Sequence, residues 1–344
     1  MESKFKHNLN DFFNKNYKIL LLIPIIMLIA SFVYMGMFFQ QNGDIIKKDI
    51  TLTGGTSIQV NSDTNIDNLK QALSKNFTDF SIREVSDITT GKQVAFIIET
   101  RASQEEMIPF LENYLGFKID SSNSSIEFTG SSIGQDVYIQ LILAIFFAFT
   151  FMGTVVFFIF SDKTKLKILL ICISLLAPFL FIFVKVITLN QAFIITFIVL
   201  AIIMYCSIRY SIPGFAVILC GFTDLFMTLV VVNLLGIEVS TAGIVAFLML
   251  IGYSVDTDIL LTTRVLKRKG DSINHRIFGS FKTGITMTLT SISVVIIGLI
   301  ITASFSDTLR QIFTILFIGL CFDIFNTWIT NVLIIKWYAE KHQL

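Results

Sequence analysis

The stretch GYSVDTDILLTTRVLKRKG, residues 252–270, places two carboxylates and an arginine at the end of a long apolar run. Asp256 and Asp258 lie inside the run, and Arg264 begins the basic cluster that follows it. A charged side chain at the centre of a bilayer costs about 2.5 to 3.5 kcal/mol on insertion scales, so such residues face a partner or a wet cavity. This stretch is therefore the first candidate for a working site inside a membrane.

The composition of the whole chain is that of a membrane protein. Of its 344 residues, 54% are hydrophobic, 35 are Phe and only 15% are charged, which gives far more apolar surface than one soluble core needs. Acidic and basic residues are distributed unevenly between the segments of the chain, and they do not form the basic patch expected of a nucleic-acid-binding surface. We therefore expect membrane lipid, and no nucleic acid, around the protein.

The sequence contains no sign of enzyme chemistry. The four cysteines lie inside apolar runs without paired spacing, and no nucleophile triad, metal motif or nucleotide loop is present. We expect no catalytic residue, no cofactor and no metal site.

The first part of the chain predicts an anchored exported domain. Residues 1–16 are polar and basic, which indicates a cytoplasmic N-terminus, and 17–39 form an apolar run of about the 20 residues that span a bilayer. Residues 40–134 have the composition of one soluble, extracytoplasmic domain.

The pattern inside this domain predicts the order β-α-β-β-α-β, a ferredoxin-like fold. The expected strands are 46–60, 80–88, 93–100 and 125–129, and the expected helices are 66–77 and 103–115. Gly54 and Gly55 interrupt the first strand, where we expect a backbone bend.

Seven further apolar segments follow the domain, at about 137–160, 166–187, 191–209, 213–234, 239–263, 280–303 and 310–336. With the anchor they make about eight transmembrane helices. Alternating sides from a cytoplasmic N-terminus places every basic loop and the tail 338–344 in the cytoplasm, as the positive-inside rule requires. The expected fold class is a polytopic α-helical membrane protein with one inserted α+β ferredoxin-like domain.

Four parts of the sequence carry a family resemblance. They are DITLTGGTSI at 49–58; FTDL at 222–225 with LLGIE at 234–238; GYSVDTDILLTTR at 252–264, which begins with Gly252 and Tyr253; and KTGITMTLT at 282–290 with FDIFNTW at 322–328. These motifs resemble those of the protein-export membrane protein SecF, in its archaeal form, from the resistance-nodulation-division superfamily.

The resemblance implies a six-helix bundle with one exported domain between its first two helices. Since this chain has eight expected helices, roughly 161–208 could hold an extra hairpin. We therefore assign 135–190 to a transmembrane hairpin, partly inserted relative to the family, and 191–337 to the SecF-type bundle.

The same resemblance implies a function. A SecF subunit acts with SecD and the SecY channel complex to move unfolded preproteins, using the proton motive force. Two alternatives stay open: a proton-coupled lipid or small-molecule exporter of the same superfamily, and a non-transporting assembly factor.

The candidate proton-relay residues are Asp224, Asp256, Asp258 and Arg264. Burial favours the neutral form of a carboxyl group, so Asp224 could carry a proton, or it could make a static hydrogen bond. Asp256 and Asp258 are about 200° apart on a helix and serve different partners. In bacterial SecF the motif reads Asn-Asp-Thr and in SecD it reads Asp-Ala-Asn, so Asp256 matches the SecD aspartate and either carboxylate could be the titrating one.

Two further features have competing interpretations. Arg264 matches the arginine that ends the family motif; it could be a fixed positive partner for a carboxylate or one more cytoplasmic anchor. Asp323 and Asn326 share a helical face in the last span, where they could line a polar seam or join two helices for about 1 kcal/mol.

Overall fold

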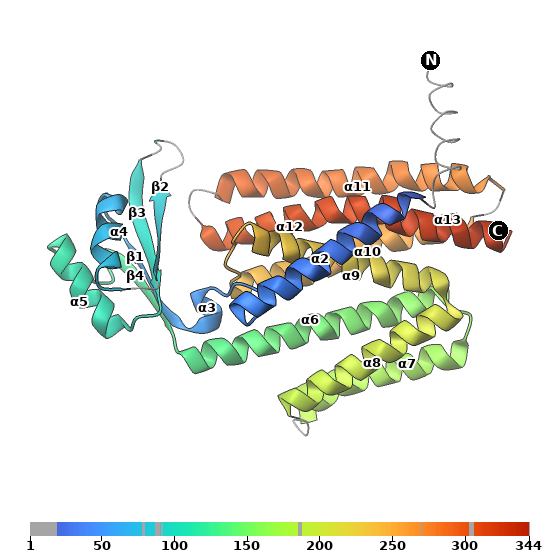
Figure 1. Ribbon diagram of the computed structural model, residues 1–344, viewed down its shortest axis with the longest axis horizontal. Helices are drawn as coiled ribbons and strands as arrows, with labels where there is room; N and C mark the ends of the chain where they lie inside the picture. Colours follow the sequence, from blue (N-terminus) through green and yellow to red (C-terminus); the bar gives the residue numbers. More distant parts are fainter. Residues whose placement is uncertain are drawn as a thin grey trace, which may run out of the picture.

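The computed structural model describes residues 19–77, 80–86, 90, 92–184, 188–268, 270–302 and 306–343. The expected cytoplasmic segment 1–16 lies outside these residues. The chain forms a helical bundle with a small α/β domain at one end (Figure 1).

The small domain has the predicted β-α-β-β-α-β order. Its elements are β1 (Gly55–Val60), α4 (Ile66–Ser74), β2 (Phe80–Ser86), β3 (Gln93–Thr100), α5 (Gln104–Leu115) and β4 (Ser124–Thr129). The antiparallel sheet has the strand order β2-β3-β1-β4, which is the arrangement of a ferredoxin-like fold.

One face of the sheet is apolar because the strands alternate side chains. Ile58 and Phe96 on that face pack against Leu69 of α4 and Leu111 of α5. The other face is polar and points toward the helical bundle, while α4 and α5 lie on the far side (Figure 1).

The prediction of one strand across 46–60 is wrong in its first half. Residues 50–53 form a short helix, α3 (Ile50–Thr53), because the Asp49 side chain accepts a hydrogen bond from the Ile50 backbone N–H and caps it. The strand begins only at Gly55. A Cβ at Gly55 would lie 2.4 Å from the Thr100 backbone oxygen, and its φ is +152°, so the close approach of β3 requires glycine.

The segment before α3 is fastened to the bundle by backbone hydrogen bonds. The Val239 N–H donates to the Lys47 oxygen at 2.7 Å, and the Asp49 N–H donates to the Val239 oxygen at 3.0 Å. The Asn233 side chain donates to the Ile45 oxygen at 2.9 Å. The domain therefore sits on a fixed connection and not on a free linker.

Among the described residues, eight helices are long and apolar enough to cross a membrane, as predicted. The helical elements of these spans are α2 (Leu22–Asn42), α6 (Ser131–Phe160), α7 (Thr164–Phe179) with the π-helix η1 (Leu180–Val184), α8 (Leu189–Tyr210), α9 (Ile212–Leu234), α10 (Thr241–Lys267), α11 (Ile273–Thr302), α12 (Asp307–Phe325), the π-helix η2 (Asn326–Asn331) and α13 (Val332–Lys341). The last three form one continuous span, Asp307–Lys341.

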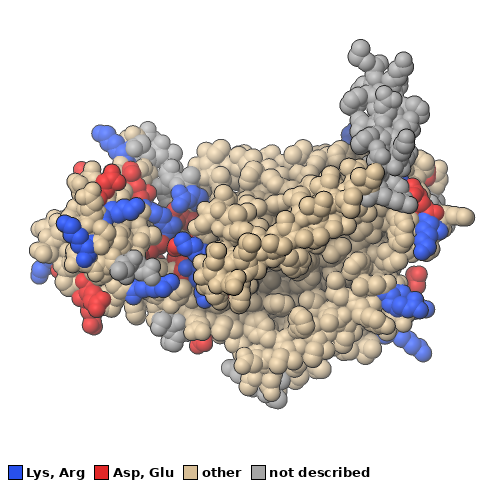
Figure 2. Space-filling view, in the orientation of Figure 1, with Lys and Arg blue, Asp and Glu red and all other residues tan. Residues whose placement is uncertain are grey.

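α9 and α10 form the centre of the bundle. They are the most buried of the spans, and α10 packs against α6, α9, α11 and α12. α7 and α8 pack beside α6 at the edge of the bundle (Figure 1). Figure 2 shows basic and acidic side chains over the domain and at the far end of the bundle, with an uncharged surface between the two ends.

Candidate functional site

Three aspartates from three helices meet inside the bundle. Asp224 of α9, Asp258 of α10 and Asp323 of α12 all have side chains that are 0% exposed. α9, α10 and α12 pack against one another. The sequence marked each residue separately, and the packing brings them together as one carboxylate cluster.

Asp224 has a neutral donor for each of its carboxyl oxygens. The Asn326 side-chain amide donates to Oδ1 at 2.6 Å, and the Ser254 hydroxyl donates to Oδ2. Thr228, one turn along, donates to the Asp224 backbone oxygen and does not touch the carboxyl group. Asp224 therefore joins α9 to α10 and to η2.

The two carboxyl oxygens of Asp258 differ in their hydrogen bonds. Its Oδ1 accepts from the Thr327 hydroxyl at 2.8 Å and from the Asn331 amide at 2.8 Å. Its Oδ2 is fully buried and has no hydrogen-bond partner within the described chain. A buried carboxylate oxygen without a donor is costly when charged.

Asp323 completes the cluster. Its Oδ1 lies 3.2 Å from the Thr327 hydroxyl, and its Oδ2 lies 3.4 Å from the Thr288 hydroxyl of α11. Asp323 and Asn326 are both fully buried. Within the described residues, no group of His, Cys, Asp and Glu is arranged to hold a metal ion.

The π-helix η2 supplies most of the polar partners. Its buried residues are Asn326, Thr327, Thr330 and Asn331. π-helical turns are rare and occur often at functional sites. Sequence reasoning missed Thr327 and Asn331, although four polar residues at 326, 327, 330 and 331 in an apolar span were a visible signal.

Asp256 points the other way. It is exposed on the outer surface of α10, as are Gly252 and Tyr253, whereas Asp258 is buried. The two aspartates therefore have different surroundings, and the prediction that they serve different partners stays a prediction. Asp256 lies near the middle of a 27-residue span, where an exposed carboxylate needs a partner helix or water.

Arg264 lies apart from the carboxylate cluster. Its guanidinium donates to the Thr283 hydroxyl at 2.7 Å and to the Gly279 backbone oxygen at 3.4 Å. Both acceptors belong to α11, so the hydrogen bonds seen in the described chain join α10 to α11 and reach no carboxylate.

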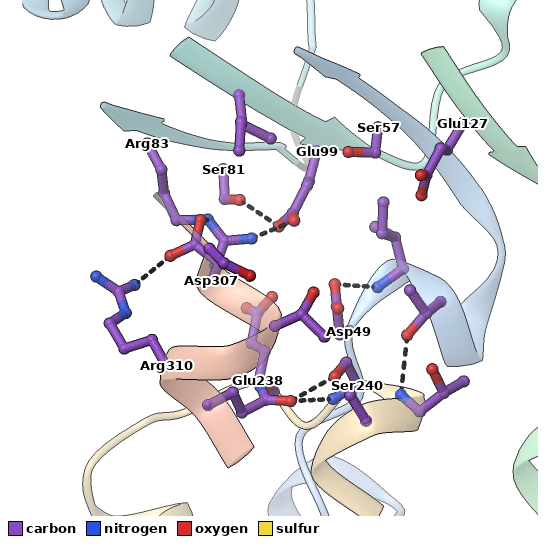
Figure 3. A pocket seen from close by; sticks show the side chains of 18 of the residues that line it. Asp49, Ser57, Ser81, Arg83, Glu99, Glu127, Glu238, Ser240, Asp307 and Arg310 are labelled. Carbon is purple, nitrogen blue, oxygen red and sulfur yellow. Dashed lines mark hydrogen bonds and ion pairs between the residues drawn. The ribbon is translucent and has the colours of Figure 1, made fainter. Parts of the chain in front are cut away.

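A second polar site lies between the domain and the bundle. A cavity of about 520 Å³ separates the polar face of the sheet from the ends of α10 and α12, and Asp49, Arg83, Glu99 and Asp307 are among its lining residues (Figure 3). Arg83 forms ion pairs with Glu99 and, at 3.4 Å, with Asp307. Burial, together with the nearby Glu99, raises the pKa of Asp49 to about 6.

Eight apolar helices and a buried carboxylate cluster, all within the described residues, define a multi-pass membrane protein with an ionisable interior. The family model described as protein export membrane protein SecD/SecF, C-terminal, matches residues 183–341. A SecF protein from Methanocaldococcus jannaschii is 32% identical over 336 residues, covering 96% of this chain and 98% of the relative. One from Methanolacinia petrolearia is 27% identical and covers 98% of both chains. The chain belongs to the SecF family of protein-export membrane proteins.

The fold is similar to that of a larger solved protein. The crystal structure of SecDF from Thermus thermophilus, a translocon-associated membrane protein, matches with a TM-score of 0.59 and 16% identity. The match covers 95% of this chain and 38% of that one. The relatives are named as protein-export membrane proteins and not as enzymes.

Proposed function

We propose that this chain is a SecF subunit that works with a SecD partner and the SecY channel complex to promote preprotein translocation, driven by the proton motive force. Membership of the SecF family supports the export role. The buried carboxylate cluster is the observation that carries the use of protons.

The cluster can hold protons because its partners are neutral. The hydrogen-bond donors to the three carboxyl groups are amides and hydroxyls of Asn326, Asn331, Ser254, Thr327 and Thr288. Three ionised carboxylates at one buried site would repel one another without a compensating cation. Protons are therefore the natural counter-charges, and their entry and exit change the electrostatics at the middle of the bundle.

One helical span connects the cluster to the domain. Asp307 at its start contacts Arg83 of β2, and Asp323 lies about 24 Å further along at the rise of an α-helix. A shift of this span would move both sites together. One charge that crosses 100 mV releases about 2.3 kcal/mol, so a few protons supply enough free energy to move a docked domain.

The exposed face of α10 supports a membrane partner. Asp256 stands there beside Gly252 and Tyr253, and a Cβ at Gly252 would meet nothing within 4 Å. A small residue beside a polar one is typical of a helix-packing surface in membranes. We assign this face to SecD, whose helix would supply a hydrogen-bond donor or a cation to Asp256.

The orientation follows from the charges. The end of the bundle far from the domain carries basic residues in a loop and at helix ends, and we place this end in the cytoplasm. These residues are Lys163, Lys165, Lys167, Arg209 and Lys267. The domain 40–134 then faces outward, where it meets the emerging chain.

The test is preprotein translocation into vesicles that contain the SecY channel, SecD and this protein, with and without an imposed proton gradient. The variants are Asp224→Asn and Asp258→Asn, with Asp271→Asn in an exposed loop as the matched control. We expect the gradient to stimulate translocation in the wild type and in the control, and not in the two cluster variants, although all four assemble with SecD.

The alternatives give different results. A lipid or small-molecule exporter would move its cargo with the gradient and leave preprotein translocation unchanged. An assembly factor would give translocation that ignores the gradient in every variant. Either result would overturn the proposal.

A further inference from the structure

The Thr327 hydroxyl lies between two buried carboxyl groups. Its Oγ1 is 2.8 Å from Asp258 Oδ1 and 3.2 Å from Asp323 Oδ1. The three side chains are 0% exposed, so no bulk water competes for these contacts. They come from three different elements, α10, α12 and η2.

The number of hydrogens limits how these contacts can form. A threonine hydroxyl has one hydrogen to donate and lone pairs to accept. When Thr327 donates to Asp258, its contact with Asp323 is a hydrogen bond only if Asp323 carries a proton and donates it. The reverse holds when Thr327 donates to Asp323. The geometry therefore suits one proton shared between the two carboxyl groups.

We propose that Thr327 relays a proton between Asp258 and Asp323. The O–H bond of protonated Asp258 breaks and its proton binds Thr327 Oγ1, while the original Thr327 hydrogen passes to the Asp323 carboxylate. Asp258 ends as the carboxylate, Asp323 as the neutral acid and Thr327 as an unchanged hydroxyl. The reverse transfer follows the same contacts.

The surroundings favour transfer along this route. The Asn331 amide holds the same Asp258 oxygen that Thr327 contacts, so that oxygen stays aimed at the hydroxyl. Ser254 lies beside both Asp224 and Asp323, which continues the chain of hydroxyl and carboxyl groups to α9. The titratable groups that face Asp258 are Asp224, Asp323 and the Cys220 thiol of α9.

This inference rests on the proposed proton coupling and names the residue that joins two of its sites. The experiment measures proton uptake into vesicles that hold the full chain and SecD, under an imposed potential and across a range of pH. Thr327→Val removes the hydroxyl and keeps the shape, and Thr327→Ser keeps the hydroxyl. Thr196→Val is the matched control, because the buried Thr196 hydroxyl of α8 donates to the Ala192 backbone oxygen and lies outside the carboxylate cluster.

We expect Thr327→Val to lower proton uptake by about tenfold or more at every pH, as for loss of a positioned proton-transfer group. Its pH midpoint should stay that of the wild type. Thr327→Ser and Thr196→Val should retain most of the uptake, and all variants should assemble with SecD.

The outcomes separate this inference from the proposed function. If Asp258→Asn abolishes uptake while Thr327→Val conducts like the wild type, the relay is wrong and the coupling stands. A Thr327→Val variant whose midpoint moves while its maximal uptake is kept would show a structural role and also overturn the relay. If Asp224→Asn and Asp258→Asn both conduct normally, the proposed function itself is wrong.

Discussion

Arg83 of strand β2 and Asp307, the first residue of α12, form an ion pair of 3.4 Å between the domain and the last membrane span. Asp307 also pairs with Arg310 at 2.6 Å, and Arg83 also pairs with Glu99 (Figure 3). The contact is partly exposed, so it contributes modestly to the stability of the protein.

We predict that Arg83→Asp loosens the domain from the bundle. An aspartate at position 83 would lie beside two other acids, Glu99 and Asp307, and would repel them. Protease should cleave the junction around residues 44–54 faster than in the wild type. The double variant Arg83→Asp with Asp307→Arg should recover part of the protection, and Lys118→Glu, exposed and distant in the domain, should cleave at the wild-type rate. Equal cleavage of all forms would show that the pair does not hold the domain.

The raised pKa of Asp49 predicts that the junction weakens as the pH rises. Burial and Glu99 favour the neutral carboxyl group in the folded protein, with Arg83 opposing them. The folded protein therefore binds more protons than the unfolded chain between pH 3.8 and about 6. The stability that neutral Asp49 contributes is fully present below pH 3.8 and is lost as the pH rises through about 6. Stability falls with pH wherever the folded state binds more protons than the unfolded state.

Asp49→Asn tests this pH dependence, since asparagine keeps an oxygen to cap α3. The loss of thermal stability between pH 5 and pH 7 should be smaller in the variant than in the wild type, measured by melting in the same detergent. An identical loss in both proteins would show that Asp49 does not titrate there.

The hydrogen bond from Asn326 to Asp224 should contribute to stability, and exchanging the two residues tests this. Asn326→Leu leaves one buried Asp224 oxygen without its donor, which costs about 1 to 3 kcal/mol. The melting temperature should fall, whereas Ser293→Ala on the exposed face of α11 should not change it. Asp224→Asn with Asn326→Asp restores an amide-carboxyl pair and should recover much of the loss. No recovery in the swapped form would show that other contacts dominate at this site.

Alanine should destabilise the protein much more at Gly55 than at Gly36. Gly55→Ala forces a Cβ to 2.4 Å from the Thr100 oxygen, so the β1–β3 pairing must shift, and we expect a loss of at least about 2 kcal/mol from the domain. At Gly36 in α2 an added Cβ meets nothing within 4 Å, so Gly36→Ala should be tolerated. Hydrogen exchange of the β1 and β3 amides compares the two; equal protection would contradict the close approach.

Much of the fold follows from patterns in the sequence. Hydrophobic alternation and helical spacing predict the β-α-β-β-α-β order, and run length predicts the eight spans. The helix at Ile50–Thr53 was missed because its β-branched residues favour a strand, whereas the Asp49 cap decides the structure. Asp49 can be recognised as a helix cap only when the path of the backbone between the first span and the domain is known.

The site was predictable residue by residue but not as an arrangement. Asp224, Asp258 and Asp323 stood out as carboxylates in apolar spans, yet only the packing of α9, α10 and α12 brings them together. The opposite directions of Asp256 and Asp258 followed from the helical angle. The hydrogen-bond partners of Arg264 could not be predicted from spacing alone, because Thr283 and Gly279 lie on another helix, α11.

The most direct test of the central claim is to measure proton uptake and preprotein translocation in the same vesicles, with wild type, Asp258→Asn and Asp271→Asn. An imposed gradient should drive both proton uptake and translocation in the wild type and in Asp271→Asn, and Asp258→Asn should lose both together while still assembling. Gradient-driven translocation that continues in Asp258→Asn, or continues in the wild type without proton uptake, would contradict the central claim.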